Sequence, residues 1–435
     1  MIVRITPCRF GGTIKVPASK SHTIRQLLIA ALADGVSEIK NPLDSLDTRS
    51  CIDVCKAFGA QIIEHGTENG ERLVWKVRGN NGFMCSAVKS FSVDVGSSGT
   101  TLFFALAIAG LQSQPVEFTG GAQIQKRSAA PLLDALAGLG VKPQSNNGCV
   151  PITIQGPWKG GRVILPCPTS QYLSALLLAA PLAPAGAVTE IEVPLLNEKP
   201  YIEMTLSYLK DIKGVSHHDT HYRISGGSSW KPFSGAVPGD FSSAAFPAAA
   251  AAITGGSVTL LGLDPQDTQG DKYFFEILEK MGCNVQWRCG LDGGETQYSV
   301  TVCRNGTLRG GTFDLNATPD LLPAAAVTAA YAEGDTFLVN AAHARIKETD
   351  RIAVMVRELA KLGVYCTELP DGLVIHGKGA LFPPENPVID GHSDHRIVMA
   401  FAAAALGSPV PVDITTAESA DATYPGFFEL LDVNN

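Results

Sequence analysis

Six stretches of the chain share one pattern, in which small polar residues precede an Ala- and Leu-rich run of helical length. Each run is apolar on nearly every side, which is typical of a helix buried inside a domain. The starts recur roughly every 70 to 80 residues, a period that indicates a repeated supersecondary unit. The stretches are SKSHTIRQLLIAALADG from 19, GSSGTTLFFALAIAG from 96, TSQYLSALLLAAPLA from 169, GDFSSAAFPAAAAAITGG from 239, PDLLPAAAVTAAYAEG from 319 and SDHRIVMAFAAAALG from 393.

Short Val- and Ile-rich runs lie between these helices, and their Gly, Asn and Pro boundaries predict strands and turns. Examples are GRVILP from 161, GSVTLLG from 256, TFLVN from 336 and GLVIHG from 372. Additional helices are predicted within 128–141, 272–283 and 350–364, each ending at a Gly as helix C-termini often do. The pattern therefore predicts an α/β fold whose unit of strands and two helices occurs six times, three times in each of two domains.

Composition narrows the class of protein. A chain of 435 residues with 45% hydrophobic content is long enough for at least two domains. Its net charge of −8 argues against nucleic-acid and anionic-membrane partners, so an anion site must be a local concentration of Lys and Arg. Residues 1–20 do not resemble a signal peptide, and the apolar runs are too short to span a membrane. The ten scattered cysteines, with no C-x-x-C pair, indicate reduced thiols, and we expect a cytoplasmic protein.

The segment IKETDRI, residues 346–352, concentrates Lys347, Glu348, Asp350 and Arg351 in a chain that is only 17% charged. One interpretation is an exposed helix start, whose charges support one helix face. The other is an anion site, because helix starts attract anions. Ser, Thr and Asp at helix starts are also ordinary N-caps, and for GDFSS we favour that role because no basic residue is near. The Lys and Arg of SKSHTIR, KETDR and SDHR favour an anion site, since a cap requires neither.

Six motifs, spread over the chain from about residue 12 onward, occur in the order and register of one enzyme family. They are VPASKSHTIRQLLIAALADG, TSQYLSALLLAAPL, EKPYIEMTL, GDFSSAAFPAAAAAI, RIKETDRI and SDHRIVMAFAAAAL. The chain thus resembles the 5-enolpyruvylshikimate-3-phosphate synthase family. The resemblance implies a two-domain inside-out α/β barrel with six βαβαββ repeats, three per domain. It also implies one discontinuous lobe of residues 1–19 with 237–435 and a second lobe of residues 20–236.

The family transfers the enolpyruvyl (carboxyvinyl) group of phosphoenolpyruvate to the 5-hydroxyl of shikimate 3-phosphate, with release of phosphate, on the route to chorismate and the aromatic amino acids. The reaction needs an acid toward the methylene carbon, a base for the hydroxyl, and cations for phosphate and carboxylate. The resemblance implies no metal and no cofactor. The expected partners are the two small substrates, without nucleic acid or membrane, and we expect a monomer.

Residues can be carried over only where the motifs match. The resemblance implies that Asp320 is the base and Glu348 the acid, with Lys20 and His395 as auxiliary proton carriers, although the residues alone leave a helix cap as an equal alternative for Asp320. Arg suits the anions because its fork binds two oxygens at once. The implied contacts to phosphoenolpyruvate are Lys20, Gly99, Arg127, Gln171, Arg351 and Arg396. The implied contacts to the acceptor are Ser21 and Arg25 at its carboxylate, Thr169, Ser170 and Lys347 at its phosphate, Tyr201 at its ring, and Gln171, Asp320 and His343, the last in place of the usual Asn.

Several residues depart from the family pattern within the expected site. Ser97 replaces Asn, while Phe103 and Ala422 stand where Arg and Lys are usual, so two cations are missing. Glu198 replaces a small polar residue near the expected acceptor phosphate. A carboxylate there repels phosphate unless a cation such as Lys199 intervenes, the carboxyl is protonated or the side chain points away.

These departures leave three functional hypotheses. The first is the shikimate-pathway enzyme itself, and the second is an enolpyruvyl transferase with a different acceptor, which Glu198 and His343 favour. The third is a non-catalytic paralog that binds anions, which Phe103 and Ala422 favour. The presence of both Asp320 and Glu348 argues against the third, because a fold alone does not need both carboxylates. We rank the hypotheses in this order.

One further segment raises a metal hypothesis. HHDTH, residues 217–221, places three histidines close together. No motif adds an acidic or cysteine ligand to them, so we expect an exposed polar loop between strands and no metal site.

Overall fold

The computed structural model describes residues 1–66, 73–82, 91–292 and 295–433. The chain divides into two compact units, one made of Met1–Pro17 with Pro238–Asn435 and the other of Ala18–Val237. Each unit has a hydrophobic core of its own. Because the first unit is discontinuous in sequence, the chain passes between the units twice.

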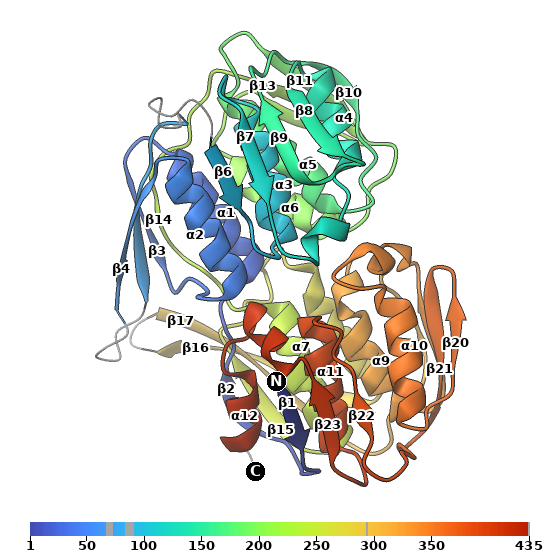
Figure 1. The fold of residues 1–435 in the computed structure, drawn as a ribbon. Helices are drawn as coiled ribbons and strands as arrows, with labels where there is room; N and C mark the ends of the chain where they lie inside the picture. The colour runs from blue at the N-terminus through green and yellow to red at the C-terminus, as the bar shows by residue number, and fades with distance from the viewer. Residues whose placement is uncertain (67–72, 83–90, 293–294, 434–435) are drawn as a thin grey trace. The chain divides into compact units, whose positions relative to one another are not determined.

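The unit Ala18–Val237 has three buried helices with four-stranded sheets around them (Figure 1). The buried helices are α1 (Lys20–Leu32), α3 (Gly99–Ala109) and α5 (Ser170–Ala179), and the others are α2 (Leu46–Ala57), α4 (Ala130–Gly138) and α6 (Lys199–Leu209). The sheet orders are β14-β3-β5-β4, β6-β7-β9-β8 and β10-β11-β13-β12. The strands are β3 (Val36–Lys40), β4 (Gln61–His65), β5 (Val74–Arg78), β6 (Phe91–Asp94), β7 (Val116–Thr119), β8 (Lys142–Asn146), β9 (Cys149–Gln155), β10 (Gly161–Ile164), β11 (Val188–Glu192), β12 (Val215–His218), β13 (His221–Ser225) and β14 (Ser234–Ala236).

The discontinuous unit repeats this arrangement. Its buried helices are α7 (Phe241–Thr254), α9 (Leu322–Ala330) and α11 (His395–Leu406), and the others are α8 (Tyr273–Lys280), α10 (Arg351–Lys361) and α12 (Phe427–Val433). Its sheet orders are β16-β17-β15-β2, β18-β19-β21-β20 and β1-β23-β22. The strands are β1 (Ile2–Ile5), β2 (Gly12–Lys15), β15 (Ser257–Leu261), β16 (Cys283–Asp292), β17 (Glu295–Arg304), β18 (Thr312–Asp314), β19 (Glu333–Val339), β20 (Cys366–Leu369), β21 (Gly372–Lys378), β22 (Val388–Ile389) and β23 (Val412–Thr415).

The same strand pattern recurs in all six sheets of the described residues. Each sheet has one parallel pair, and its remaining pairing is antiparallel. In four of the sheets, such as those of β6 with β7 and β18 with β19, the two parallel strands flank a buried helix in the chain. Three sheets are completed by strands distant in sequence, because β14 pairs with β3, β2 with β15 and β1 with β23. The six copies predicted from the sequence period are therefore confirmed.

The Ala-rich helices are buried as predicted. In α7 all residues but the last are buried, and the side chain of Asp240 accepts a hydrogen bond from the backbone N–H of Ser243 at 2.9 Å. The cap predicted for GDFSS is thus confirmed. A Cβ at Gly407, just after α11, would lie 2.5 Å from Cγ2 of Ile253 in α7, so the close approach of these helices requires glycine.

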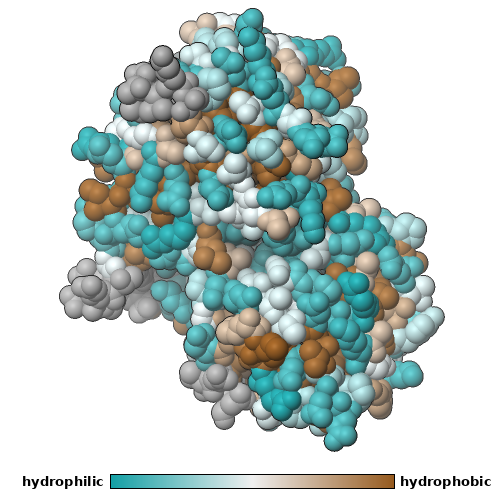
Figure 2. Space-filling model, in the orientation of Figure 1, coloured by the Kyte–Doolittle hydropathy of each residue, from teal (hydrophilic) through white to brown (hydrophobic). Residues whose placement is uncertain are grey.

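The surface in Figure 2 is mostly hydrophilic to neutral, and its apolar side chains form small separate patches. In the described part of the chain, no helix is both long and apolar enough to cross a membrane.

The histidine segment forms a hairpin. His217 and His218 end β12, His221 begins β13, and His218 pairs with His221 across the turn. The side chain of His218 is 91% exposed, as predicted. The prediction that all three histidines lie in a loop was wrong, because β12 and β13 extend up to the two-residue turn between them. Among the described residues, no group of three or more His, Cys, Asp or Glu is arranged to hold a metal ion.

Candidate active site

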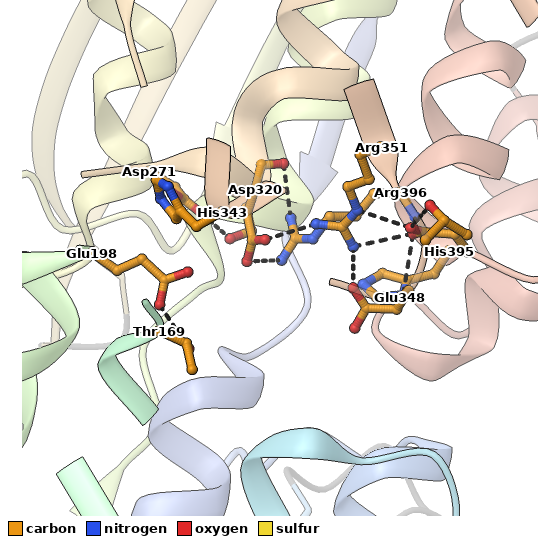
Figure 3. Close-up of polar contacts among 12 residues, drawn as sticks. Thr169, Glu198, Asp271, Asp320, His343, Glu348, Arg351, His395 and Arg396 are labelled. Atoms are coloured by element: carbon orange, nitrogen blue, oxygen red, sulfur yellow. Dashed lines mark hydrogen bonds and ion pairs between the residues drawn. The ribbon is translucent and has the colours of Figure 1, made fainter. Parts of the chain in front are cut away.

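Arg351 forms the centre of a charged cluster in the discontinuous unit. Its guanidinium is fully buried and pairs with three carboxylates (Figure 3). The Nη1 atom lies 2.8 Å from Asp320, Nη2 lies 2.5 Å from Glu348, and Nε lies 2.8 Å from Asp394. One cation therefore holds the expected base and the expected acid in the same place.

Three helix starts bring these side chains together. Arg351 is the first residue of α10, and Asp350 caps that helix by accepting from the N–H of Ala353 at 3.1 Å. Asp394 caps α11, and Asp320 lies in a single turn, Pro319–Leu321, that leads into α9. The exposed-helix interpretation of IKETDRI is wrong for Arg351, because its side chain points into the unit and not into solvent.

Arg396 is a second guanidinium at this site. Its Nη2 atom lies 3.0 Å from the carboxylate of Asp320, and its Nη1 donates to the backbone oxygen of Asp320 at 3.4 Å. Burial raises the pKa of Asp320, but the positive charges of Arg396, Lys347 and Arg351 outweigh burial and hold that pKa well below its ordinary value. Asp320 is therefore ionised at neutral pH. Its side chain forms these ion pairs, and Thr318, not Asp320, takes the N-cap position of the turn Pro319–Leu321.

Asp271, in the turn Gly270–Lys272, is a further buried carboxyl of this unit. It is 1% exposed and accepts a hydrogen bond from the hydroxyl of Ser242 (Figure 3). Burial and the negative charge of Asp320 raise its pKa to about 7, although Arg396 opposes the shift. A proton can therefore be held beside Asp320 near neutral pH.

Two histidines of the predicted set are also buried in this unit. His343 lies within Ala342–Ile346, and its Nε2 donates to the backbone oxygen of Asn316 at 3.1 Å. His395 is the first residue of α11, with Nδ1 3.9 Å from Asp394. Both histidines are only 4% exposed, so each is part of the packed site and not a surface group.

Arg25 of α1 forms a buried cationic site in the unit Ala18–Val237. Its guanidinium donates to the hydroxyls of Thr205 at 2.9 Å and Ser174 at 3.3 Å, and to the backbone oxygens of Ser21 at 3.0 Å and Tyr201 at 3.2 Å. Burial lowers its pKa to about 10, which still leaves it charged at neutral pH. Among the described residues it has no carboxylate partner, so its charge is held by neutral oxygens and is available to an anion.

A second group of this unit surrounds the start of α3. A Cβ at Gly99 would lie 2.6 Å from Nη1 of Arg127 and 3.6 Å from Oε1 of Gln171, so glycine allows these three predicted residues to meet. Gln171 also donates to the hydroxyl of Thr100 at 3.2 Å. Phe103, where the family pattern has Arg, is buried beside this group and supplies an aromatic face in place of a cation.

Glu198 lies against the start of α5 in the same unit. Its Oε2 atom accepts from the hydroxyl of Thr169 at 3.1 Å, and from the backbone N–H of Ser170 at 2.9 Å and its hydroxyl at 2.8 Å (Figure 3). The alternative in which the Glu198 side chain points away from Thr169 and Ser170 is therefore wrong. The expectation that Lys199 neutralises it finds no support, since that side chain is 72% exposed and lies 3.8 Å from Glu203.

Lys20 begins α1, and its Nζ lies 2.9 Å from Asp47 in the first turn of α2. Both side chains are 14% exposed. The lysine of SKSHTIR is thus held at a helix start, where the motif places it.

The structure brings Asp320, Lys347, Glu348, Arg351 and Arg396 together within one unit, although their motifs are separated by up to 76 residues. Several contacting residues were missed. Asp394 lies inside a quoted motif but was given no role, and its position before a predicted helix was a usable signal. For the others no local signal exists, because they act through partners distant in sequence; they are Asp47, Ser174, Thr205 and Asp271.

A family model described as EPSP synthase (3-phosphoshikimate 1-carboxyvinyltransferase) matches residues 6–431. The chain belongs to this family. A protein of Acetivibrio thermocellus named 3-phosphoshikimate 1-carboxyvinyltransferase is 42% identical over 99% of this chain and 97% of its own length. A protein of the same name from Halobacterium salinarum is 37% identical over 99% of this chain and 98% of its own length. A solved EPSP synthase from Acinetobacter baumannii matches with a TM-score of 0.81 and 29% identity, over 100% of this chain and 98% of that one.

Membership of the EPSP synthase family confirms the predicted fold class, a two-domain inside-out α/β barrel of six βαβαββ repeats. The departures from the family pattern are built into this structure. Phe103 packs edge-on against Tyr172 with ring centroids 5.0 Å apart, so an aromatic pair occupies the place of the usual Arg. Ala422 ends the turn Ala417–Ala422 and adds no charge.

Proposed function

We propose that this chain transfers the carboxyvinyl group of phosphoenolpyruvate to the 5-hydroxyl of shikimate 3-phosphate and releases phosphate. The single observation that carries the proposal is the pairing of Arg351 with both Asp320 and Glu348. A carboxylate pair held by one cation can divide base and acid duties, because small differences in surroundings separate their proton affinities. Family membership supports the reaction, and the cluster supports the assignment of the acid and base to Glu348 and Asp320.

The cluster must rearrange its charges when phosphoenolpyruvate binds. In the free protein the positive charges of Arg351 and Arg396 are shared with carboxylates. An anionic substrate that takes over part of these guanidinium contacts weakens their hold on Asp320, so its pKa rises toward the range useful for a base. Binding of the donor thus prepares Asp320 to accept the proton of the acceptor hydroxyl, while Glu348 protonates the methylene carbon.

The other unit supplies the proposed cradle for the acceptor. Arg25, held by neutral oxygens, is suited to the acceptor carboxylate, and Thr169 with Ser170 is suited to its phosphate. Gly99, Arg127 and Gln171 are proposed to contact phosphoenolpyruvate together with Lys20. Tyr201 completes the acceptor contacts, and from the discontinuous unit Lys347 and His343 are proposed to reach the acceptor, with His395 as a proton carrier.

The remaining expectations stand as proposals of the same kind. The two compact units serve as the two lobes of the enzyme, with boundaries near residues 19 and 237. The protein acts as a monomer in the cytoplasm.

The test is release of phosphate from phosphoenolpyruvate by purified protein in the presence of shikimate 3-phosphate. Asp320→Asn and Glu348→Gln should each lower kcat by about 10²- to 10⁴-fold, the usual contribution of a positioned acid or base. Glu368→Gln is the control, because this partly exposed acid pairs only with Arg345 at 2.8 Å among the described residues. Wild-type activity that survives both active-site substitutions would overturn the assigned roles.

Glu198 favours the second hypothesis, an enolpyruvyl transferase with a different acceptor, so the test must also address it. Wild-type protein that releases phosphate with another hydroxylated anion, but not with shikimate 3-phosphate, would establish that hypothesis. Folded protein that binds both anions, but does not release phosphate with any acceptor that is tested, would instead support the non-catalytic paralog.

A further inference from the structure

Glu198 is a buried acid whose carboxylate rests on the start of α5. Glu198 is only 2% exposed. One oxygen of its carboxylate accepts three hydrogen bonds from two consecutive residues, Thr169 and Ser170. The donors are two hydroxyls and one backbone N–H. This is the set of contacts that a helix start offers to a bound anion.

The backbone of Glu198 is strained in this position. It has φ 58° and ψ 40°, the left-handed region that residues with a Cβ rarely adopt. Such strain persists only where the surroundings fix the residue, and strained residues gather at functional sites. Its chain neighbours Lys199 and Pro200 begin α6, so the unusual backbone directs the carboxylate away from its own helix and toward α5.

The carboxylate and an incoming anion cannot use the same donors. The Ser170 N–H has a single hydrogen, and it already points at Glu198 Oε2 at 2.9 Å. The hydroxyls of Thr169 and Ser170 are likewise directed at this oxygen. A phosphate can take these three donors only when the carboxylate leaves them, and two anions placed together would repel each other.

We propose that Glu198 is a specificity-determining residue that occupies the α5 start as an internal anion and competes with the phosphate of the acceptor. The inference rests on the proposed function, since it takes the acceptor to be a phosphorylated one. Glu198 keeps the donors of Thr169 and Ser170 oriented in the free protein and lowers the affinity for phosphate by having to be displaced. It does not select for the acceptor's carboxylate or hydroxyl groups.

Two substitutions separate charge from shape. Glu198→Gln keeps the length and hydrogen-bonding capacity of the side chain and removes its charge, while Glu198→Ser removes its reach. Glu203→Gln is the matched control, because this acid lies one turn further along α6 and is 53% exposed. Dissociation constants for shikimate 3-phosphate and for shikimate, which lacks the phosphate, are measured by titration calorimetry.

Both Glu198 variants should bind shikimate 3-phosphate at least about tenfold more tightly than wild type, a change of about 1.4 kcal/mol. Binding of shikimate should stay the same in every variant, and Glu203→Gln should match wild type for both compounds. Circular dichroism confirms that each variant is folded before it is titrated. Equal or weaker binding of shikimate 3-phosphate by folded Glu198→Gln would overturn the inference, because Glu198 would then support the site and not compete for it.

The same experiment keeps the two proposals apart. Wild-type turnover of shikimate 3-phosphate with unchanged affinity in the Glu198 variants would retain the proposed function and reject the role of Glu198. Tighter phosphate-dependent binding in those variants, without any turnover by wild type, would retain the role of Glu198 and reject the proposed function.

Discussion

At the scale of single residues, two buried guanidinium groups, one in each unit, are held in opposite ways. Arg351 is surrounded by carboxylates, whereas Arg25 is held by hydroxyl and carbonyl oxygens. A buried ion pair stabilises its geometry only where further hydrogen bonds offset the cost of removing charges from water. Asp394 meets that condition, because it also caps α11. Arg351 is therefore fixed in place by contacts that also stabilise the fold, whereas the charge of Arg25 is available to a ligand.

Asp271 gives a prediction about pH. Because its pKa is raised to about 7 in the folded protein, its contribution to stability is complete below about pH 4 and is lost as pH rises through 7. Asp271→Asn should abolish this loss, which amounts to about 1.4 kcal/mol for each unit by which the pKa is raised. The free energy of unfolding in urea is measured for both proteins from pH 5 to pH 8. A constant difference between them across this range would contradict the raised pKa.

At the scale of elements, the start of α10 joins fold and site. Asp350 caps the helix and also pairs with Arg345 at 2.8 Å, so it fixes the position from which Arg351 enters the cluster. A second contact that serves both fold and site joins α3 to α5. Phe103 of α3 packs on Tyr172 of α5, and the hydroxyl of Tyr172 donates to the backbone oxygen of Ser128 at 2.6 Å. The aromatic pair thus joins two buried helices. An Arg in the place of Phe103 would have needed a negatively charged partner there.

The capping role of Asp350 can be separated from its ion pair. Asp350→Ala removes both, and it should lower the free energy of unfolding by about 0.5–2 kcal/mol. Asp350→Asn keeps a good N-cap and loses only a partly exposed ion pair, so it should cost clearly less. Urea unfolding of the two variants beside wild type makes the comparison. Equal losses would show that the ion pair, and not the cap, holds the start of α10.

At the scale of the whole molecule, the proposed acceptor contacts come from both compact units. Thr169 and Ser170 belong to the unit Ala18–Val237, whereas Lys347 belongs to the discontinuous unit. Enzymes built from two compact units commonly close when a ligand binds.

Closure is therefore expected when the acceptor binds. Small-angle scattering should show a smaller radius of gyration with saturating shikimate 3-phosphate than without it, because the ligand's carboxylate would neutralise Arg25 of one unit and its phosphate Lys347 of the other. Lys347→Met should weaken the change, since it removes the proposed contact from one unit. A scattering profile that saturating acceptor leaves unaltered would count against closure.

The sequence by itself determined the six buried helices, the helices α4, α8 and α10, the six-copy repeat and the family. Helix and strand depend on the local pattern of apolar residues, and α7 could be predicted because alanines and a capping Asp240 lie within one short stretch. It also identified the charged residues of the site. Only the tertiary structure decided their partners: Arg25 meets Thr205 across 180 residues, Arg351 meets Asp394 across 43, and Glu198 meets Thr169 across 29. Such pairs are set by how buried helices pack, and no local pattern encodes which helix start a side chain will reach.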